Sequence, residues 1–300
     1  MVDSRMAIRL VAIGCIIGAL AGVTLLLCTT PEWQVTEDGR VEYPPVKLDY
    51  SAKMIEAADT YTLSEVSYKS RDAQIAGLLR IPTDANRRVP GVVVLPGATV
   101  SKEGEQGLAK YLCSLGYASI ALDQRNLGII DIQSDLERFV NNEEPTEHKM
   151  VHDALVAAAV LRDQPEIDPD RIVYAGESNG ARFAIIACAL DPEARGVIAI
   201  STCGYGIEAA LASGRLVEPE LIRFYKSIDP ETYLSNVSPR RFVMLHSVND
   251  TIIDYANAEQ SYGKAHEPKA LYTVTCTTHG YCSEMADALK TELAGMVGVA

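Results

Sequence analysis

Short apolar runs alternate with longer segments of mixed polarity through most of the chain. The apolar runs have the length of strands buried on both faces, and they cover residues 91–95, 171–175, 196–200, 241–246 and 270–274. The longer segments have the spacing of helices, and the clearest of them cover residues 105–115, 150–162 and 181–190. Strands and helices that alternate in this order indicate an α/β fold, with a mostly parallel central sheet and helices on both of its faces.

Polar residues between the apolar runs mark two further features. Strands at 65–68 and 74–80 flank a polar turn, which predicts an antiparallel hairpin at the edge of the sheet. Residues 203–239 separate two predicted strands, and their mixed pattern predicts two or three short helices. Such an insertion is either a lid over a site or a surface excursion. The chain has 300 residues and 48% hydrophobic content, so we expect one large domain over residues 60–300.

The N-terminal 30 residues follow a different pattern. Leu10 to Cys28 is a run of 19 uncharged, mostly apolar residues, and Arg5 and Arg9 precede it. About 20 such residues cross a bilayer as a helix, and the arginines favour a cytoplasmic N-terminus. We therefore expect a transmembrane signal anchor (1–30) in the cell membrane, a proline-containing tether (31–59), and a domain outside the cytoplasm. A secreted protein released by signal cleavage is the alternative.

One pentapeptide joins a predicted strand to a predicted helix. Gly176-Glu177-Ser178-Asn179-Gly180 lies between the apolar run at 171–175 and the helical segment at 181–190. A G-x-S-x-G sequence at a strand-to-helix turn is typical of a nucleophile elbow, in which the glycines leave room for a strained turn that exposes the serine hydroxyl. The alternative is an ordinary glycine-rich turn with a solvated serine.

A serine nucleophile needs a base, and the base needs an acid that orients it. Asp250 follows the strand at 241–246, and His279 lies on the loop after the last predicted strand. We predict these two as acid and base, with Asp254 as the competitor for the acid. His246 lies inside a strand, where a packed core histidine is expected. The other histidines are predicted on a helix (His148 and His152) and on a surface loop (His266).

An oxyanion also needs preorganised N–H donors. The backbone N–H of Asn179, directly after the serine, is the first predicted donor. The second is expected on the loop after residues 91–95, where Ala98 is our first choice and Thr99 the second. Pro96 has no N–H, and Gly97 allows the tight turn.

These stretches together resemble the α/β-hydrolase superfamily, most closely the dienelactone-hydrolase and prolyl-oligopeptidase-like group. The resemblance runs from about Tyr61 to the C-terminus and rests on residues 92–98, 115–123, 167–172, the elbow, the turn at Asp250 and His279-Gly280. It implies a catalytic triad of Ser178, Asp250 and His279. Pro96 stands where many relatives carry histidine, and Glu177 and Asn179 are uncommon in the elbow, so no relative's substrate preference transfers directly.

We therefore expect a serine hydrolase that cleaves a carboxylic ester through an acyl-enzyme, acting on a small-molecule ester or a short peptide. A serine peptidase of the prolyl-oligopeptidase-like type is one alternative, although no propeller-like region precedes the predicted domain. A non-catalytic binding module that retains the fold is the other. The sequence does not indicate an oligomeric state.

Charge and sequence motifs limit the partners and cofactors that we expect, and the cysteines suggest a disulfide. The net charge of −13 argues against nucleic acid as a partner. No C-x-x-C pair, H-E-x-x-H sequence or phosphate-binding loop is present, so neither a metal nor another cofactor is expected. The acidic segment at 127–147 is interpreted as a solvated face. Cys276 and Cys282 bracket His279 and are placed to pair in an oxidising compartment.

Overall fold

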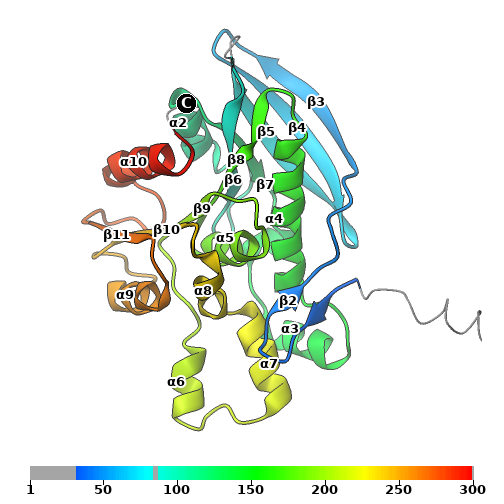
Figure 1. Cartoon of the computed structure of the whole chain (residues 1–300), viewed down its shortest axis with the longest axis vertical. Helices are drawn as coiled ribbons and strands as arrows, with labels where there is room; N and C mark the ends of the chain where they lie inside the picture. Colours follow the sequence, from blue (N-terminus) through cyan, green and yellow to red (C-terminus); the bar gives the residue numbers. More distant parts are fainter. Residues whose placement is uncertain (1–31, 84–86, 299–300) are drawn as a thin grey trace, which may run out of the picture.

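The computed structural model describes residues 32–83 and 87–298, which form a mixed sheet flanked by helices (Figure 1). The nine-stranded sheet has the order β11-β10-β9-β8-β6-β7-β5-β4-β3. Its strands are β3 (Tyr50–Ala57), β4 (Tyr61–Ser70), β5 (Ala73–Pro82), β6 (Val89–Leu95), β7 (Ala118–Leu122), β8 (Ile167–Glu177), β9 (Gly196–Ile200), β10 (Arg241–Ser247) and β11 (Lys269–Val274). A separate pair consists of β1 (Gln34–Val35) and β2 (Val41–Glu42).

Strands β6 to β11 pair in parallel, and β3, β4 and β5 pair antiparallel at one edge. The predicted parallel sheet and the predicted hairpin (β4 and β5) are both confirmed. The central parts of the parallel strands are mostly apolar because both of their faces are covered. On β6, for example, Val93 and Leu95 face one hydrophobic cluster, and Val92 and Val94 face the other.

Helices cover both faces of the sheet, as predicted. On one face lie α4 (Thr146–Arg162) and α5 (Asn179–Leu190), and on the other lie α2 (Gln106–Ser114) and α10 (Ala286–Val297). The remaining helices are α3 (Ile132–Val140), α6 (Ile207–Ala212), α7 (Pro219–Ile228), α8 (Leu234–Val237) and α9 (Tyr255–Lys264). Helices α6, α7 and α8, with a 3₁₀ turn at Pro230–Thr232, confirm the short helices predicted for residues 203–239.

The segment interpreted as a tether is folded from residue 32 on. Strand β3 pairs antiparallel with β4 and forms the outer edge of the sheet. Val41 is fully buried, and its N–H donates to the Tyr233 hydroxyl at 2.8 Å. The tether interpretation is therefore wrong for this segment. The pattern did not reveal β3 because almost all of its side chains are exposed, so backbone pairing rather than an apolar face holds it in place.

The acidic segment at 127–147 is only partly a solvated face. Asp135, Glu144 and Glu147 are buried. Asp135 accepts hydrogen bonds from the N–H groups of Thr146 and Glu147 at 2.7 and 2.9 Å, which caps the start of α4. Glu144 pairs with Arg71 at 2.7 Å. These acids are structural, and the sequence could not separate them from their exposed neighbours because their partners lie elsewhere in the fold.

The predicted transmembrane helix at Leu10 to Cys28 lies outside the described residues. Among residues 32–83 and 87–298, none of the helices combines the length and the apolar character that a bilayer crossing needs.

Candidate active site

Ser178 lies at the sharp turn between β8 and α5. Its backbone has φ 52° and ψ −118°, a conformation that a non-glycine residue adopts only under strain. The Ser178 N–H donates to the Ile200 carbonyl at 2.9 Å, and the Thr202 hydroxyl donates to the Ser178 carbonyl at 2.9 Å. The neighbouring strand β9 therefore holds the turn in this geometry.

The two elbow glycines are required by close packing of the helix on the sheet. A Cβ atom at Gly180 would lie 2.2 Å from the Leu95 carbonyl oxygen, and one at Gly176 would lie 2.6 Å from the Gly180 backbone. Both contacts are far below the distance that real Cβ atoms adopt. The start of α5 consequently lies directly against the end of β6.

Asp250 and His279 meet across the loops that follow β10 and β11. The Nδ1 atom of His279 lies 2.8 Å from Oδ2 and 3.0 Å from Oδ1 of Asp250. The Asp250 carboxylate is buried and also accepts from the N–H groups of Ile252 and Ile253 at 2.9 and 3.1 Å. Burial by itself would raise the pKa of Asp250, but the Ile253 N–H, His279 and the Ile252 N–H together lower it below its usual value.

The other ring nitrogen of His279, Nε2, is buried and has no hydrogen bond partner within residues 32–83 and 87–298. The described residues also include no hydrogen bond between Nε2 and the Ser178 hydroxyl. Such bonds are often long before a substrate binds. Two contacts attach the His279 loop beside the elbow: Gly280 N–H donates to the Ser201 hydroxyl at 3.1 Å, and Tyr281 N–H donates to Glu177 Oε2 at 3.0 Å.

Residue His246 is fully buried in β10, as expected for a packed core histidine. Its Nε2 lies 2.9 Å from the Ile253 carbonyl oxygen and 3.7 Å from Asp250 Oδ2. Burial lowers the pKa of His246 below its usual value, so this ring is neutral at neutral pH. His246 therefore supports the turn that presents Asp250, a role that its position inside a strand did not reveal.

The two donors predicted on the loop after β6 differ in their hydrogen bonding. Thr99 N–H donates to the Leu127 carbonyl at 2.7 Å, whereas Ala98 N–H has no hydrogen bond partner in the described part of the chain. This arrangement favours Ala98 over Thr99 as an anion donor. Asn179 is the first residue of α5, where the N–H groups have no partner inside the helix.

Sequence reasoning missed the loop at 124–128, which contacts the residues around the predicted N–H donors Ala98 and Asn179. The Gln124 side chain donates to the Pro96 carbonyl, and the Asn179 side chain donates to the Gly128 carbonyl at 3.1 Å. Gly128 has φ +69°, and a Cβ atom there would lie 3.4 Å from the Ala98 Cα. No sequence pattern marks this loop, because its partners lie about 28 and 51 residues away.

The burial of two carboxyl groups at the elbow was also not predicted: Glu105 is buried, and Glu177 is half-buried. Burial, with the nearby Glu177 as the second cause, raises the pKa of Glu105 to about 8. Burial likewise raises the pKa of Glu177, although the Tyr281 N–H opposes this rise. A Cβ atom at Gly280 would lie 2.4 Å from Glu177 Oε2, so the carboxyl group occupies the space beneath the His279 loop.

Cys276 and Cys282 form a disulfide that spans this loop, which is the pairing their positions suggested. The ends of the segment that carries His279 are therefore covalently joined. No group of three or more His, Cys, Asp or Glu side chains in residues 32–83 and 87–298 is arranged to hold a metal ion.

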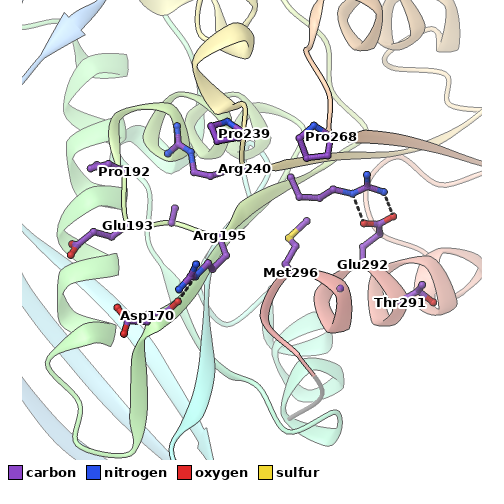
Figure 2. A pocket seen from close by; sticks show the side chains of 13 residues that line it. Asp170, Pro192, Glu193, Arg195, Pro239, Arg240, Pro268, Thr291, Glu292 and Met296 are labelled. Atoms are coloured by element: carbon purple, nitrogen blue, oxygen red, sulfur yellow. Dashed lines mark hydrogen bonds and ion pairs between the residues drawn. The ribbon is translucent and has the colours of Figure 1, made fainter.

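A cavity of about 710 Å³ lies beside the serine and is lined by both Ala98 and Asn179. A larger hollow of about 870 Å³ lies at the opposite edge of the sheet, where β9 and β10 begin (Figure 2). There Arg241 pairs with Glu292 at 2.7 and 2.8 Å, and none of the predicted site residues is present. The smaller cavity is therefore the one associated with the candidate site.

The sheet order, the elbow after β8 and the loops after β10 and β11 are those of an α/β-hydrolase. The model of the acetyl xylan esterase (AXE1) family matches residues 34–237, about two thirds of the chain, so the chain belongs to this family. The match includes Ser178, Ala98 and Asn179 and ends before Asp250 and His279.

Two curated relatives are similar over about half of the chain. The acyltransferase drtE of Aspergillus calidoustus is 31% identical over a region that covers 51% of this chain and 49% of the relative. The uncharacterized protein YfhR of Escherichia coli (strain K12) is 28% identical over 45% of this chain and 47% of the relative. The chain thus spans about half the length of the curated relatives it matches.

Solved structures share the fold over most of both chains. Acetyl xylan esterase 1 from Thermoanaerobacterium sp. aligns with a TM-score of 0.68 at 15% identity, over 84% of this chain and 89% of that one. A glucuronoyl esterase from Solibacter usitatus aligns with a TM-score of 0.62 at 15% identity, over 88% and 89%. At this level of identity the likeness establishes the fold alone.

Proposed function

We propose that the chain is a serine esterase that hydrolyses a small-molecule carboxylic ester through an acyl-enzyme. The observation that carries this proposal is the pairing of His279 Nδ1 with the buried Asp250 carboxylate, which leaves Nε2 without a partner. The loop that carries His279 is attached to the elbow of the strained Ser178 through Tyr281 and Glu177. Family membership and the ester-cleaving enzymes among the structural neighbours agree with it.

In the proposed mechanism, His279 Nε2 accepts the proton of the Ser178 hydroxyl as its oxygen attacks the ester carbonyl. Asp250 keeps the proton of the imidazole on Nδ1 and stabilises the imidazolium that forms. The N–H groups of Ala98 and Asn179 bind the oxyanion of the tetrahedral intermediate. His279 then protonates the leaving alcohol, and a water molecule activated by the same ring releases the acid from Ser178.

The nucleophile is tested by replacing Ser178 with alanine. We expect Ser178→Ala to lose nearly all hydrolysis of p-nitrophenyl esters and all labelling by a fluorophosphonate probe, while its thermal unfolding is unchanged. Ser235→Ala, at an exposed serine, is the matched control and should behave like the wild type. Esterase activity of Ser178→Ala within tenfold of the wild type would contradict the assignment.

Base and acid are tested in the same assay. His279→Gln should cost about as much activity as Ser178→Ala, because the groups act as a unit. Asp250→Asn should reduce kcat by on the order of 10³- to 10⁴-fold, because an asparagine does not hold the required tautomer. Asp254→Asn, at the competing carboxylate, should have an activity close to that of the wild type.

The alternative functions are tested separately. Hydrolysis of peptide amides, assayed beside the esters, would indicate the peptidase. Absence of fluorophosphonate labelling in the folded wild type would favour the binding module.

We further propose that the N-terminal segment anchors the domain outside the cytoplasm. The support is the apolar run from Leu10 to Cys28 after Arg5 and Arg9, together with the Cys276–Cys282 disulfide, since such bonds persist mainly in oxidising compartments. Protease added to intact cells that produce the chain should digest the domain or release it. Protection until lysis would place the domain in the cytoplasm.

A further inference from the structure

The cavity beside the serine carries a positive charge that has no acidic partner. Arg182, one helical turn after Ser178 on α5, and Tyr205, near the start of the 203–239 insertion, lie on its wall with Ala98 and Asn179. Ile129, Ile130 and Ile132 supply an apolar side of the same cavity. A ligand bound there would contact both the proposed oxyanion donors and the guanidinium group.

Neutral groups hold Arg182 in place. Its Nε–H donates to the Cys203 carbonyl at 2.9 Å, and Nη1 donates to the Asn179 side-chain oxygen at 3.2 Å. The guanidinium carbon lies 4.3 Å from the centre of the Tyr205 ring, a cation–π contact. These contacts orient the planar group without neutralising it.

Among the described residues, no carboxylate lies within ion-pair distance of Arg182. Two other partly buried arginines differ in this respect: Arg125 pairs with Asp153 at 2.8 Å and Arg241 with Glu292 at 2.7 Å. An arginine side chain remains protonated at all ordinary pH values. The charge is therefore open to a ligand.

Three acids lie near this wall, and none of them forms an ion pair with Arg182. Asp229 accepts the N–H groups of Tyr205 and Glu231 at 3.3 and 3.0 Å. Glu147 accepts the Tyr205 hydroxyl at 2.8 Å, and burial raises the pKa of Glu147 to about 8, so this carboxyl is mainly protonated at neutral pH. Asp131 lines the cavity but is exposed, and its carboxylate accepts the Ser134 N–H at 3.0 Å at the start of α3.

We propose that Arg182 binds a carboxylate of the substrate, so that the preferred substrates are esters that carry a second, ionised carboxyl group. The inference rests on the proposed function for the reaction, although the binding itself does not require turnover. A planar guanidinium forms paired hydrogen bonds with a carboxylate that a neutral group cannot reproduce. The isoleucines provide the surface for the apolar part of such a ligand.

The test compares two ligands of nearly the same shape, 4-acetoxybenzoate and its neutral methyl ester. Their dissociation constants are measured by calorimetry with the full chain carrying Ser178→Ala, so that neither ligand is consumed. We expect the anion to bind at least about tenfold more tightly than the methyl ester, as for a hydrogen bond between charged groups. Equal affinities would overturn the inference.

Substitution of Arg182 assigns the preference to this side chain. Adding Arg182→Gln to Ser178→Ala should remove the preference, and Arg182→Lys, which keeps the charge without the planar fork, should reduce it at least about threefold. The matched control is Arg215→Gln, which removes the same charge from an exposed arginine whose partner is the Ser213 hydroxyl. Each variant is first checked for cooperative thermal unfolding. If the glutamine variant does not fold, the lysine variant decides, and an unchanged preference there overturns the inference.

Kinetics separate this inference from the proposed function. A wild type that hydrolyses both esters with equal kcat/KM overturns the role of Arg182 and leaves the esterase intact. A wild type that hydrolyses neither ester and is not labelled by fluorophosphonate contradicts the esterase, while the dissociation constants still decide whether Arg182 selects an anion.

Discussion

At the scale of single residues, the candidate site depends on groups held under constraint. Ser178 keeps a positive φ because two hydrogen bonds hold its backbone. Its N–H donates to the Ile200 carbonyl at the end of β9, and its carbonyl accepts from the hydroxyl of Thr202, just after β9. Asp250 keeps its negative charge while buried because two N–H groups and His279 surround it. Each constraint lies in contacts outside the residue itself, which explains why strain can persist there.

The elbow glycines provide a direct test of close packing. Gly180→Ala should destabilise the fold by about 1–3 kcal/mol, because the added Cβ meets the Leu95 and Pro96 carbonyl oxygens at 2.2 and 2.3 Å. Urea unfolding measures the change. Gly107→Ala is the control, because nothing lies within 4 Å of a Cβ atom at this helical position. There we expect a stability equal to or slightly above that of the wild type, and a similar loss in both variants would contradict the packing argument.

At the scale of elements, the site is assembled from loops that follow β6, β7, β8, β9, β10 and β11. Ligands of open parallel sheets commonly bind where the strands end, because the loops there converge at one edge. The insertion with α6, α7 and α8 contributes Tyr205 to the cavity. The first residues of the insertion therefore take part in the candidate site, which argues against a surface excursion remote from it. Strand β3 lies at the far edge of the sheet, whereas β1 and β2 form a separate pair in which Val41 bonds Tyr233 of the insertion, so we expect these strands to act on stability.

The N-terminal strands can be removed in two steps. A chain beginning at Pro31 keeps β1, β2 and β3 and should unfold cooperatively. A chain beginning at Tyr61 loses the pairing of β3 with β4 and the burial of Val41 against Tyr233, so it should have a lower melting temperature and associate through the exposed edge of β4. Calorimetry and size-exclusion chromatography measure both effects. Equal stability of the two chains would show that residues 31–60 contribute nothing to the fold.

At the scale of the whole molecule, buried ionisable groups make stability depend on pH. Burial raises the pKa values of Glu105 and Glu147 to about 8, and it lowers those of His148 and His152 to about 3 and about 4. The histidines add stability as pH rises toward their unfolded value of about 6.5. Above that value the two glutamates dominate: the folded protein keeps protons that the unfolded chain has already released, so stability falls as pH rises to about 8.

Substitution of Glu105 tests one part of this dependence of stability on pH. Between pH values of about 6.5 and about 8, the free energy of unfolding of the wild type should fall, by on the order of 1–2 kcal/mol for each buried glutamate. Glu105→Gln should remove its share, because the neutral amide has no proton to release. Glu103→Gln is the control, since this exposed carboxylate pairs with Lys102. Urea titrations across this range measure the slopes, and an unchanged slope in Glu105→Gln would contradict the argument.

The sequence by itself determined the features that depend on local order along the chain. The apolar runs predicted the parallel strands, and the glycines around Ser178 predicted the turn, because buried strands and tight turns restrict which residues can occupy them. Asp250 and His279 were chosen by their positions after strands, since the carboxyl ends of parallel strands meet at one edge. The structure brings these two side chains to within 2.8 Å of each other.

Only the tertiary structure decided the features whose partners are distant in sequence. The exposed strand β3, the buried acids Asp135 and Glu147 and the open charge of Arg182 all depend on such contacts. A polar residue looks the same in a sequence whether water or a distant backbone group satisfies it. Burial and pairing across the fold determine its charge and its availability, and no local pattern encodes them.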